Sequence, residues 1–253
     1  MGFFTSLANP NRFSRFTTRL SPFLIGATLI AFAVGLYMAF FVAPEDYQQG
    51  QTVRIMFVHV PAAWLAMFCY TLMTASAIGT LVWKHPLADV SAKAAAPLGA
   101  MFTLLALVTG SLWGKPMWGT WWVWDARLTS VLVLFLMYLG LIALWNTIEE
   151  PGRAAKVTAL TILVGFINIP IIKFSVDWWN TLHQPASVIR VDGPTIHPDI
   201  LIPLLVMALA FTLAFLSLHM LAMRNELMRR RVRRLQSNLA HAADLDTVPE
   251  AAE

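Results

Sequence analysis

Six long stretches of apolar residues alternate along the chain with short polar connections. They cover residues 22–42, 60–83, 94–113, 128–145, 157–172 and 200–221. A helix needs about 20 mostly apolar residues to cross roughly 30 Å of hydrocarbon, and the fourth and fifth stretches reach that length only with flanking residues. The stretches are continuous and lack the alternation of barrel strands. The pattern therefore predicts an all-α integral membrane protein, a six-transmembrane-helix bundle.

Composition supports the same class. Of the 253 residues, 58% are hydrophobic and only 13% are charged, whereas about a quarter of the residues of a soluble domain are charged. This excludes a soluble domain, a disordered chain and a nucleic-acid-binding protein, despite a net charge of +4. The single cysteine, Cys69, excludes disulfide scaffolds, cysteine-based zinc sites and Cys-x-x-Cys redox chemistry within this chain.

Lysine and arginine concentrate in alternate connections. Thirteen of them fall on the side of both termini and five on the other side. Cytoplasmic loops carry the excess of these residues, so both termini are predicted to be cytoplasmic. We expect a basic tail at residues 1–21, a membrane domain at residues 22–223, and a tail at residues 224–253 that is first basic and then acidic. The arginines of the second tail are interpreted as a topology anchor on anionic lipid, with an acidic partner as the alternative.

The six apolar stretches contain no Asp, Glu, Lys or Arg. Secondary transporters and proton pumps normally carry ionisable residues at membrane depth, so a coupled ion transporter is disfavoured. Asn168 is the notable polar residue inside a stretch, and its side chain is expected to bond backbone carbonyls freed by Pro170. The groups capable of chemistry lie instead at the ends of the stretches, mostly at one end.

Five of the ten tryptophans lie within twelve residues of the connection between the third and fourth stretches. They are Trp113, Trp118, Trp121, Trp122 and Trp124. Tryptophan favours membrane interfaces, which accounts for one or two of them. Five in one connection are more typical of a flat aromatic surface that binds a large planar or apolar ligand.

Other residues of this connection, residues 113–129, fit the same interpretation. Asp125 and Arg127 lie at its edge, where we expect them to pair with each other or with a charged group of the ligand. Gly114 and Gly119 are expected to allow tight turns beneath the rings.

Two histidines fall on the same side as the tryptophans. His59 precedes Val60 and Pro61 at the start of the second stretch, and His183 lies in the last connection on that side. Taken alone, each is more typical of a hydrogen-bonding surface residue. Beside an aromatic surface, however, two imidazoles suit the axial coordination of a haem iron. His197, on the same side, is a third candidate ligand or a helix cap.

The run Trp118-Gly-Thr-Trp-Trp-Val-Trp-Asp-Ala-Arg-Leu-Thr129 resembles the tryptophan-rich WWD signature of haem-handling proteins in cytochrome c maturation. Six spans, the position of the signature between the third and fourth, and His-Val-Pro at the second extend the resemblance over nearly the whole chain. Within that family, length and span number match the haem exporter C branch. The resemblance implies a protein that binds haem at the periplasmic face of the bacterial inner membrane and delivers it to a membrane-tethered haem chaperone.

The resemblance also implies a role for each matching residue. His59 and His183 match the axial ligands of the iron of a b-type haem that is held non-covalently and transiently. The signature platform is matched by Trp118, Trp121, Trp122, Trp124 and Asp125. Arg127, and more weakly Arg54, are candidates to bind the haem propionates through forked hydrogen bonds.

Members of this family work with an ATP-binding-cassette pair and a small single-span subunit, and the sequence itself contains no Walker motif. Two alternatives to delivery are a transmembrane haem channel and a membrane redox protein carrying haem b. The charge-free interior offers no visible polar route for two propionates, and no histidine pair is placed toward the cytoplasmic side, so delivery is the leading hypothesis. An enzyme is not expected, because the outer side shows no nucleophile with a base partner.

Overall fold

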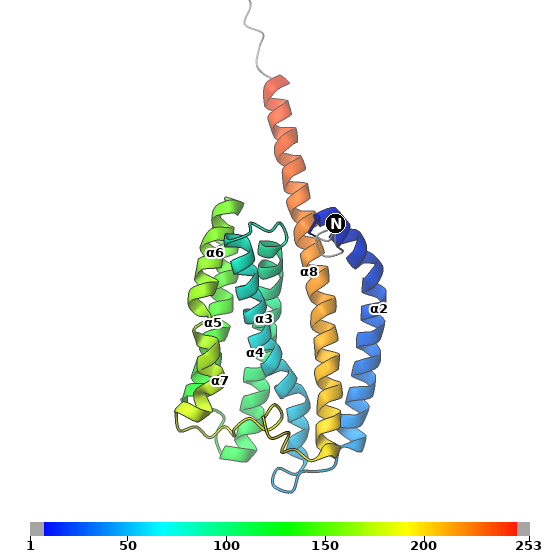
Figure 1. The fold of residues 1–253 in the computed structure, drawn as a ribbon, viewed down its shortest axis with the longest axis vertical. Helices are drawn as coiled ribbons and strands as arrows, with labels where there is room; N and C mark the ends of the chain where they lie inside the picture. The colour runs from blue at the N-terminus through cyan, green and yellow to red at the C-terminus, as the bar shows by residue number, and fades with distance from the viewer. Residues whose placement is uncertain (1–7, 247–253) are drawn as a thin grey trace, which may run out of the picture.

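The computed structural model describes residues 8–246, which form helices joined by short connections (Figure 1). In chain order these are α2 (Pro10–Tyr37), the π-helical turn η1 (Met38–Val42), the 3-10 turn η2 (Gln51–Ile55), α3 (Met56–Leu81), α4 (Ala88–Trp118), α5 (Ala126–Thr147), α6 (Pro151–Gly165), α7 (Asn168–Trp178) and α8 (Pro198–Asp246). Within the described residues, six helical segments are long and apolar enough to cross a membrane. The predicted all-α bundle of six spans is confirmed.

Capping residues set several of the helix boundaries. The side chain of Asn9 accepts hydrogen bonds at the start of α2, with Pro10 in the first turn, and Glu150 and Asp125 cap α6 and α5 in the same way. The C-terminal end of α4 is set by Gly119, which follows the helix and has a φ of +75°, the left-handed conformation that favours glycine. Most of the helices are longer than the predicted apolar stretches, because the helical backbone hydrogen bonds continue into the polar residues at their ends.

The helices are arranged in one bundle with α3 and α4 at its centre (Figure 1). On one side α8 packs against both, and α2 packs along α8; on the other side lie α5, α6 and α7. We call the end with residues 119–125 the loop end and the opposite end, where α2 begins, the termini end. At the termini end α8 continues far beyond the bundle, so residues 224–246 of the predicted tail are helical.

The fifth span is not one helix, although the apolar pattern predicted a continuous stretch over residues 157–172. α6 ends at Gly165 and α7 begins at Asn168. Pro170 has no N–H to donate to the carbonyl four residues earlier, and its ring crowds that carbonyl, so the helix breaks there. The Asn168 side chain donates to the Ser130 carbonyl of α5 at 2.9 Å. It therefore bonds a neighbouring helix, and not the carbonyls that Pro170 frees.

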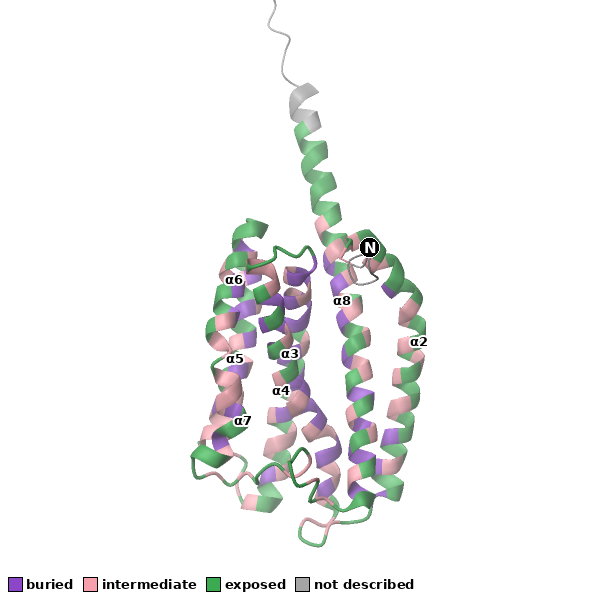
Figure 2. Cartoon of the chain, in the orientation of Figure 1, coloured by how far each residue is buried: buried purple, intermediate pink, exposed green. Residues whose placement is uncertain are grey.

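Large aromatic side chains fill the centre of the bundle. Tyr70 and Tyr138 are fully buried with ring centroids 5.5 Å apart, and the Tyr138 hydroxyl donates to the Ala66 carbonyl at 2.7 Å. Gly99 of α4 faces the Tyr138 ring, where any side chain would collide. Buried residues lie on the inner faces of the helices, while α2 exposes much of its surface (Figure 2). The dense centre holds α3, α4 and α5 in fixed positions beneath the loop end.

Candidate haem-binding cavity

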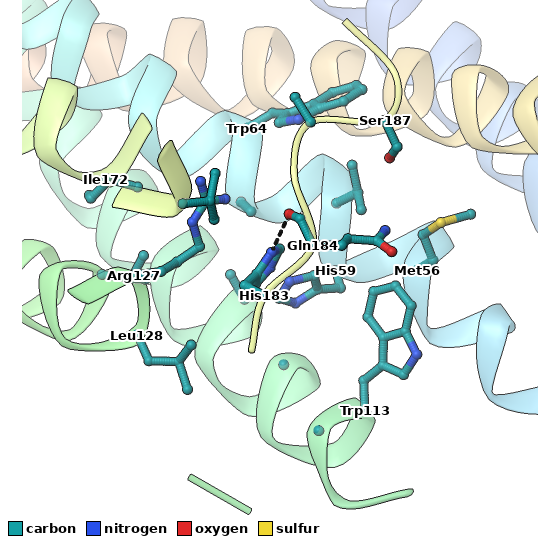
Figure 3. Close-up of a pocket in the computed structure, with 18 of the residues that line it drawn as sticks. Met56, His59, Trp64, Trp113, Arg127, Leu128, Ile172, His183, Gln184 and Ser187 are labelled. Carbon is teal, nitrogen blue, oxygen red and sulfur yellow. Dashed lines mark hydrogen bonds between the residues drawn. The ribbon is translucent and has the colours of Figure 1, made fainter. Parts of the chain in front are cut away.

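A cavity of about 460 Å³ lies at the loop end of the bundle (Figure 3). Its walls come from α3, α4, α5, α7 and the connection between α7 and α8. The volume falls in the range of small-molecule sites, roughly 300–1,000 Å³. The lining is mostly apolar and aromatic, and its nitrogen-bearing groups include His59, His183 and Arg127.

His59 lies near the start of α3 and faces α4. The helix begins at Met56, so His59 and Pro61 lie inside it and not before it. The Nδ1 of His59 is 3.1 Å from the Thr109 hydroxyl, which donates its own proton to the Leu105 carbonyl at 2.6 Å. The hydroxyl must therefore accept from Nδ1–H, which leaves the Nε2 lone pair free.

His183 reaches the cavity from the connection between α7 and α8. Its Nδ1 is 3.1 Å from the Gln184 carbonyl oxygen, which can only accept, so Nδ1 carries the proton here too. Burial lowers the pKa of His183 below its ordinary value, and the positive charge of Arg127 lowers it further. The imidazole is thus kept neutral, with its Nε2 lone pair free.

The two imidazoles lie next to each other in the cavity (Figure 3). A tryptophan flanks each of them. The ring centroids of His59 and Trp113 are 5.7 Å apart at an interplanar angle of 74°, and those of His183 and Trp118 are 6.3 Å apart at 58°. The cavity thus combines two imidazoles with flat aromatic walls.

The tryptophans of the predicted platform divide into two groups. Trp113, Trp118 and Trp122 line the cavity. Trp121 and Trp124 do not, and they are 54% and 75% exposed. The ring of Trp121 lies beneath Lys115 Nζ, at 5.8 Å. The tryptophans that line the cavity therefore come from the end of α4, from Trp122 and, on α3, from Trp64, and not from the whole signature.

Asp125 is used to position the chain and, within the described residues, forms no ion pair with Arg127. One oxygen of its carboxylate accepts from the Leu128 N–H at 2.7 Å and caps α5, and the other accepts from the Thr181 hydroxyl. The Thr181 hydroxyl oxygen in turn accepts from the His183 N–H at 3.1 Å. Asp125 thereby holds the segment that carries His183 against the start of α5.

Arg127 lines the cavity and bridges α5 to α7. Its Nε donates to the Ser175 hydroxyl at 3.0 Å and its Nη2 to the Lys173 carbonyl at 3.3 Å. A guanidinium has five N–H donors, so others are left to bind a carboxylate. Arg54 lies elsewhere: its guanidinium donates to the Phe40 carbonyl, and it is not part of the cavity lining.

Most of the lining residues were not predicted from the sequence, and Trp64 and Gly110 are two of them. Trp64 lies five residues after His59 on α3, about 140° further round the helix, so its spacing from His59 gave no signal that both line one cavity. Gly110 faces His59, where a Cβ would lie 2.9 Å from the Cε1 atom of the ring. Gly114, predicted in a turn, lies within α4 and leaves room for the Trp118 ring, because a Cβ there would be 3.0 Å from it. The close approaches of His59 to Gly110 and of Trp118 to Gly114 can be recognised only in the three-dimensional structure.

His197, the third candidate ligand, is outside the cavity lining. Its Nδ1 lies 3.5 Å from the Asp199 carboxylate and 3.3 Å from the Asp199 N–H, at the start of α8. This is the position of a helix cap, which was the other interpretation of His197.

The donor set determines what the cavity can hold. Among the side chains that the structure describes, no three of His, Cys, Asp or Glu are placed to hold a bare metal ion. Two imidazoles are instead the axial pair that a metalloporphyrin needs, since the porphyrin supplies its own in-plane nitrogens. Aromatic walls and Arg127 match its flat apolar ring and its acidic substituents.

Comparison with known proteins agrees with this chemistry. The family model described as "Heme exporter protein C" matches residues 3–238. "Heme exporter protein C" of Bradyrhizobium diazoefficiens is 66% identical over 91% of this chain and 87% of that protein. The protein of the same name in Escherichia coli strain K12 is 45% identical over 87% of this chain and 88% of its own.

A relative from Marchantia polymorpha carries a different name, "Putative cytochrome c biosynthesis ccmC-like mitochondrial protein". It is 48% identical over 82% of this chain and 88% of its own length. The match to the family model covers the apolar parts of all six membrane segments and every residue that lines the cavity. The chain belongs to the heme exporter protein C family.

Proposed function

We propose that this protein binds haem in the loop-end cavity, with His59 and His183 as axial ligands, and hands it to a haem chaperone in cytochrome c maturation. The single observation that carries the proposal is that the two histidines share one hydrogen-bond geometry, with Nδ1 of each 3.1 Å from an oxygen of the protein. Each Nδ1–H is held by an acceptor of the protein, so each Nε2 presents a lone pair within one cavity. Metal-binding histidines usually have this arrangement, in which the second nitrogen donates to a fixed partner.

The surrounding side chains support a non-covalent, b-type haem. Thioether attachment of haem, as in c-type cytochromes, needs a reactive cysteine, and Cys69 is fully buried and does not line the cavity. The aromatic walls supply the stacking contacts, and Arg127 supplies N–H donors for a propionate. The names of the relatives, which refer to haem export and cytochrome c biosynthesis, support the same cargo.

Transient binding is supported by the unequal settings of the two ligands. His59 lies in a helix within the packed bundle, whereas His183 lies in a connection without regular structure between Trp178 and Pro198. The histidine of a partner can displace His183 by moving this connection alone. Delivery to a membrane-tethered chaperone requires a release step of this kind.

The excess of lysine and arginine at the termini end supports a periplasmic position for the cavity in the bacterial inner membrane. The partners expected from the family are the chaperone, an ATP-binding-cassette pair and a small single-span subunit. The cavity lies at the loop end and its lining does not include the residues of the termini end, which favours handling at one face over conduction through the bundle. Within this proposal the protein is a carrier and not an enzyme.

The first experiment is an absorption spectrum of the protein purified with haem. The wild type is expected to show a six-coordinate, low-spin, bis-histidine spectrum, and the double variant His59→Ala, His183→Ala is expected to lose it. His197→Ala is the matched control, because His197 lies at the same end but outside the cavity. Retention of the spectrum in the double variant would exclude this ligand pair.

Delivery is tested separately by co-expression with the haem chaperone, scoring haem bound covalently to the chaperone. Loading is expected to fall to background without this protein and in the double variant. Normal loading in its absence would exclude delivery and leave haem binding intact. The channel alternative is tested in proteoliposomes that have haem inside and the chaperone outside. If the protein is a channel, haem must cross the bilayer and load the chaperone.

A further inference from the structure

A second cavity, of about 410 Å³, lies at the termini end between α4, α5 and α8. α4 packs against both α5 and α8, and all three helices contribute residues to the lining of this cavity. The lining has a polar part with Lys93, Glu226 and Arg229, and an apolar part with Pro97, Leu98 and Ile142. This cavity shares no lining residue with the loop-end cavity.

The polar part carries an excess of positive charge. Glu226 is 3.2 Å from Lys93 Nζ and 2.9 Å from Arg230 Nε, and it also pairs with Arg229. Arg230 reaches Asp89 as well, at 2.7 Å. Three cations thus share two carboxylates, and the guanidinium of Arg229, half-exposed, has donors beyond its bond to Glu226.

Trp145 adds an unpaired donor to the same cavity. Its side chain is buried, and its indole N–H has no acceptor among the described residues. Buried polar atoms almost always have a partner, so an oxygen of a bound ligand is a reasonable acceptor for this group. The indole N–H of Trp145 and the excess positive charge of the cavity together favour an anionic ligand with oxygen acceptors.

The position of the cavity restricts the class of that ligand. Lys93 lies near the start of α4, and Trp145 lies two residues before the end of α5 at Thr147, so the polar part is at the level where spans leave the hydrocarbon. The apolar part lies deeper along the same helices. No His, Cys, Met or Tyr of the described chain lines the cavity, so a haem there would lack an axial ligand.

We propose that this cavity binds an anionic phospholipid of the leaflet at the termini end. Its phosphate contacts Lys93, Arg229 and the indole N–H of Trp145, and its acyl chains lie on Pro97, Leu98 and Ile142. This site is independent of haem binding at the loop end.

The test is native mass spectrometry of the full-length protein, offered equal amounts of dioleoyl phosphatidylglycerol and dioleoyl phosphatidylcholine. The wild type is expected to retain phosphatidylglycerol preferentially, and Arg229→Gln to retain about tenfold less of it, since a charge-assisted hydrogen bond is lost. Arg231→Gln is the matched control, because Arg231 is exposed on the same helix and lies outside the cavity. Trp145→Phe keeps an aromatic ring, removes the donor, and is expected to lower retention severalfold.

Three results would overturn the proposal. Equal loss in Arg229→Gln and Arg231→Gln would mean that lipid binds to the charge of the helix and not to the cavity. Equal retention of the two lipids would leave no site for an anionic headgroup. Displacement of phosphatidylglycerol by the same concentration of inorganic phosphate or haem would assign the cavity to a different ligand.

Discussion

The two ends of the bundle use their polar side chains in different ways. At the termini end, most charged groups pair with one another: Glu226 lies between Lys93 and Arg230 at 3.2 and 2.9 Å, and the further donors of Arg229 and the indole N–H of Trp145 are left for a ligand. At the loop end, Arg127 bonds neutral groups, while the Nε2 atoms of His59 and His183 form no hydrogen bond within the described part of the chain. The difference separates two purposes. Paired charges hold helices in place, whereas groups left half-satisfied are available to a ligand.

The largest effect on stability is expected when the ion pairs of Glu226 at the termini end are removed. Glu226→Ala leaves Lys93 and Arg229 without a carboxylate in a site where the Glu226 side chain is only 10% exposed. We expect a loss of about 3 kcal/mol in the free energy of unfolding, measured in detergent micelles. The haem spectrum of the folded protein should stay unchanged.

Glu149→Ala is the control for this prediction, because Glu149 is exposed at the same end and has no ion pair within the described residues. It should change stability by less than about 0.5 kcal/mol. Loss of haem in Glu226→Ala without loss of stability would show that the two ends do not act separately.

The second largest effect tests the division of the tryptophans. Replacing Trp113, Trp118 and Trp122 together by Leu removes three lining rings, each contributing about 1 kcal/mol of stacking, so haem affinity should fall on the order of a hundredfold. The double change of Trp121 and Trp124 to Leu alters rings outside the lining and should change the affinity little. Affinity is measured by haem titration. Equal losses of haem affinity in the two variants would mean that all tryptophans of the signature contact haem.

A smaller effect is expected from crowding His59. In Gly110→Ala the added Cβ would lie 2.9 Å from Cε1 of the ring, so the imidazole must leave its rotamer. This costs about 1 kcal/mol, or roughly a fivefold loss of haem affinity. Gly140→Ala, which places its Cβ in open space on α5, should leave affinity unchanged. An unaffected Gly110→Ala protein would mean that the position of His59 is not critical.

The smallest effect concerns pH. Protonation of His183 removes the lone pair that binds iron, and the positive charge of Arg127 lowers the pKa of His183. Arg127→Gln should therefore raise that pKa, so that haem is lost at a higher pH during acid titration, by a fraction of a pH unit. Arg127→Lys keeps the charge and should keep the midpoint near that of the wild type. Equal shifts in both variants would assign the effect to geometry and not to charge.

Much of the fold could be predicted because lipid imposes one rule on every span. A continuous apolar stretch must form a helix, so the number and order of spans follow from hydropathy alone. The break between α6 and α7 did not follow, although Pro170 was visible, because many membrane helices accommodate a proline without breaking. Whether Asn168 bonds its own helix or the next depends on how α5 and α7 pack.

The candidate site was predictable in its composition and not in its geometry. Residue type and predicted side placed His59, His183 and the tryptophans at one end. The direction of each ring depends on the helical phase of α4 and on the turn at Gly119, so Trp121 and Trp124 were not distinguishable from Trp118. The role of Asp125 in holding the His183 segment depends on Thr181, which is 56 residues away in the sequence.

The length of α8 has a consequence for anything that meets its far end. At 1.5 Å per residue, its 49 residues measure about 74 Å, more than twice the roughly 30 Å of hydrocarbon. A continuous helix of this kind is a stiff spacer. A group docked on its last turns stands some tens of ångströms from the membrane surface, several times the screening length of about 8 Å in physiological salt. The charge of such a group would therefore be screened from the bundle. Any coupling between the docked group and the bundle would have to be mechanical, through the helix.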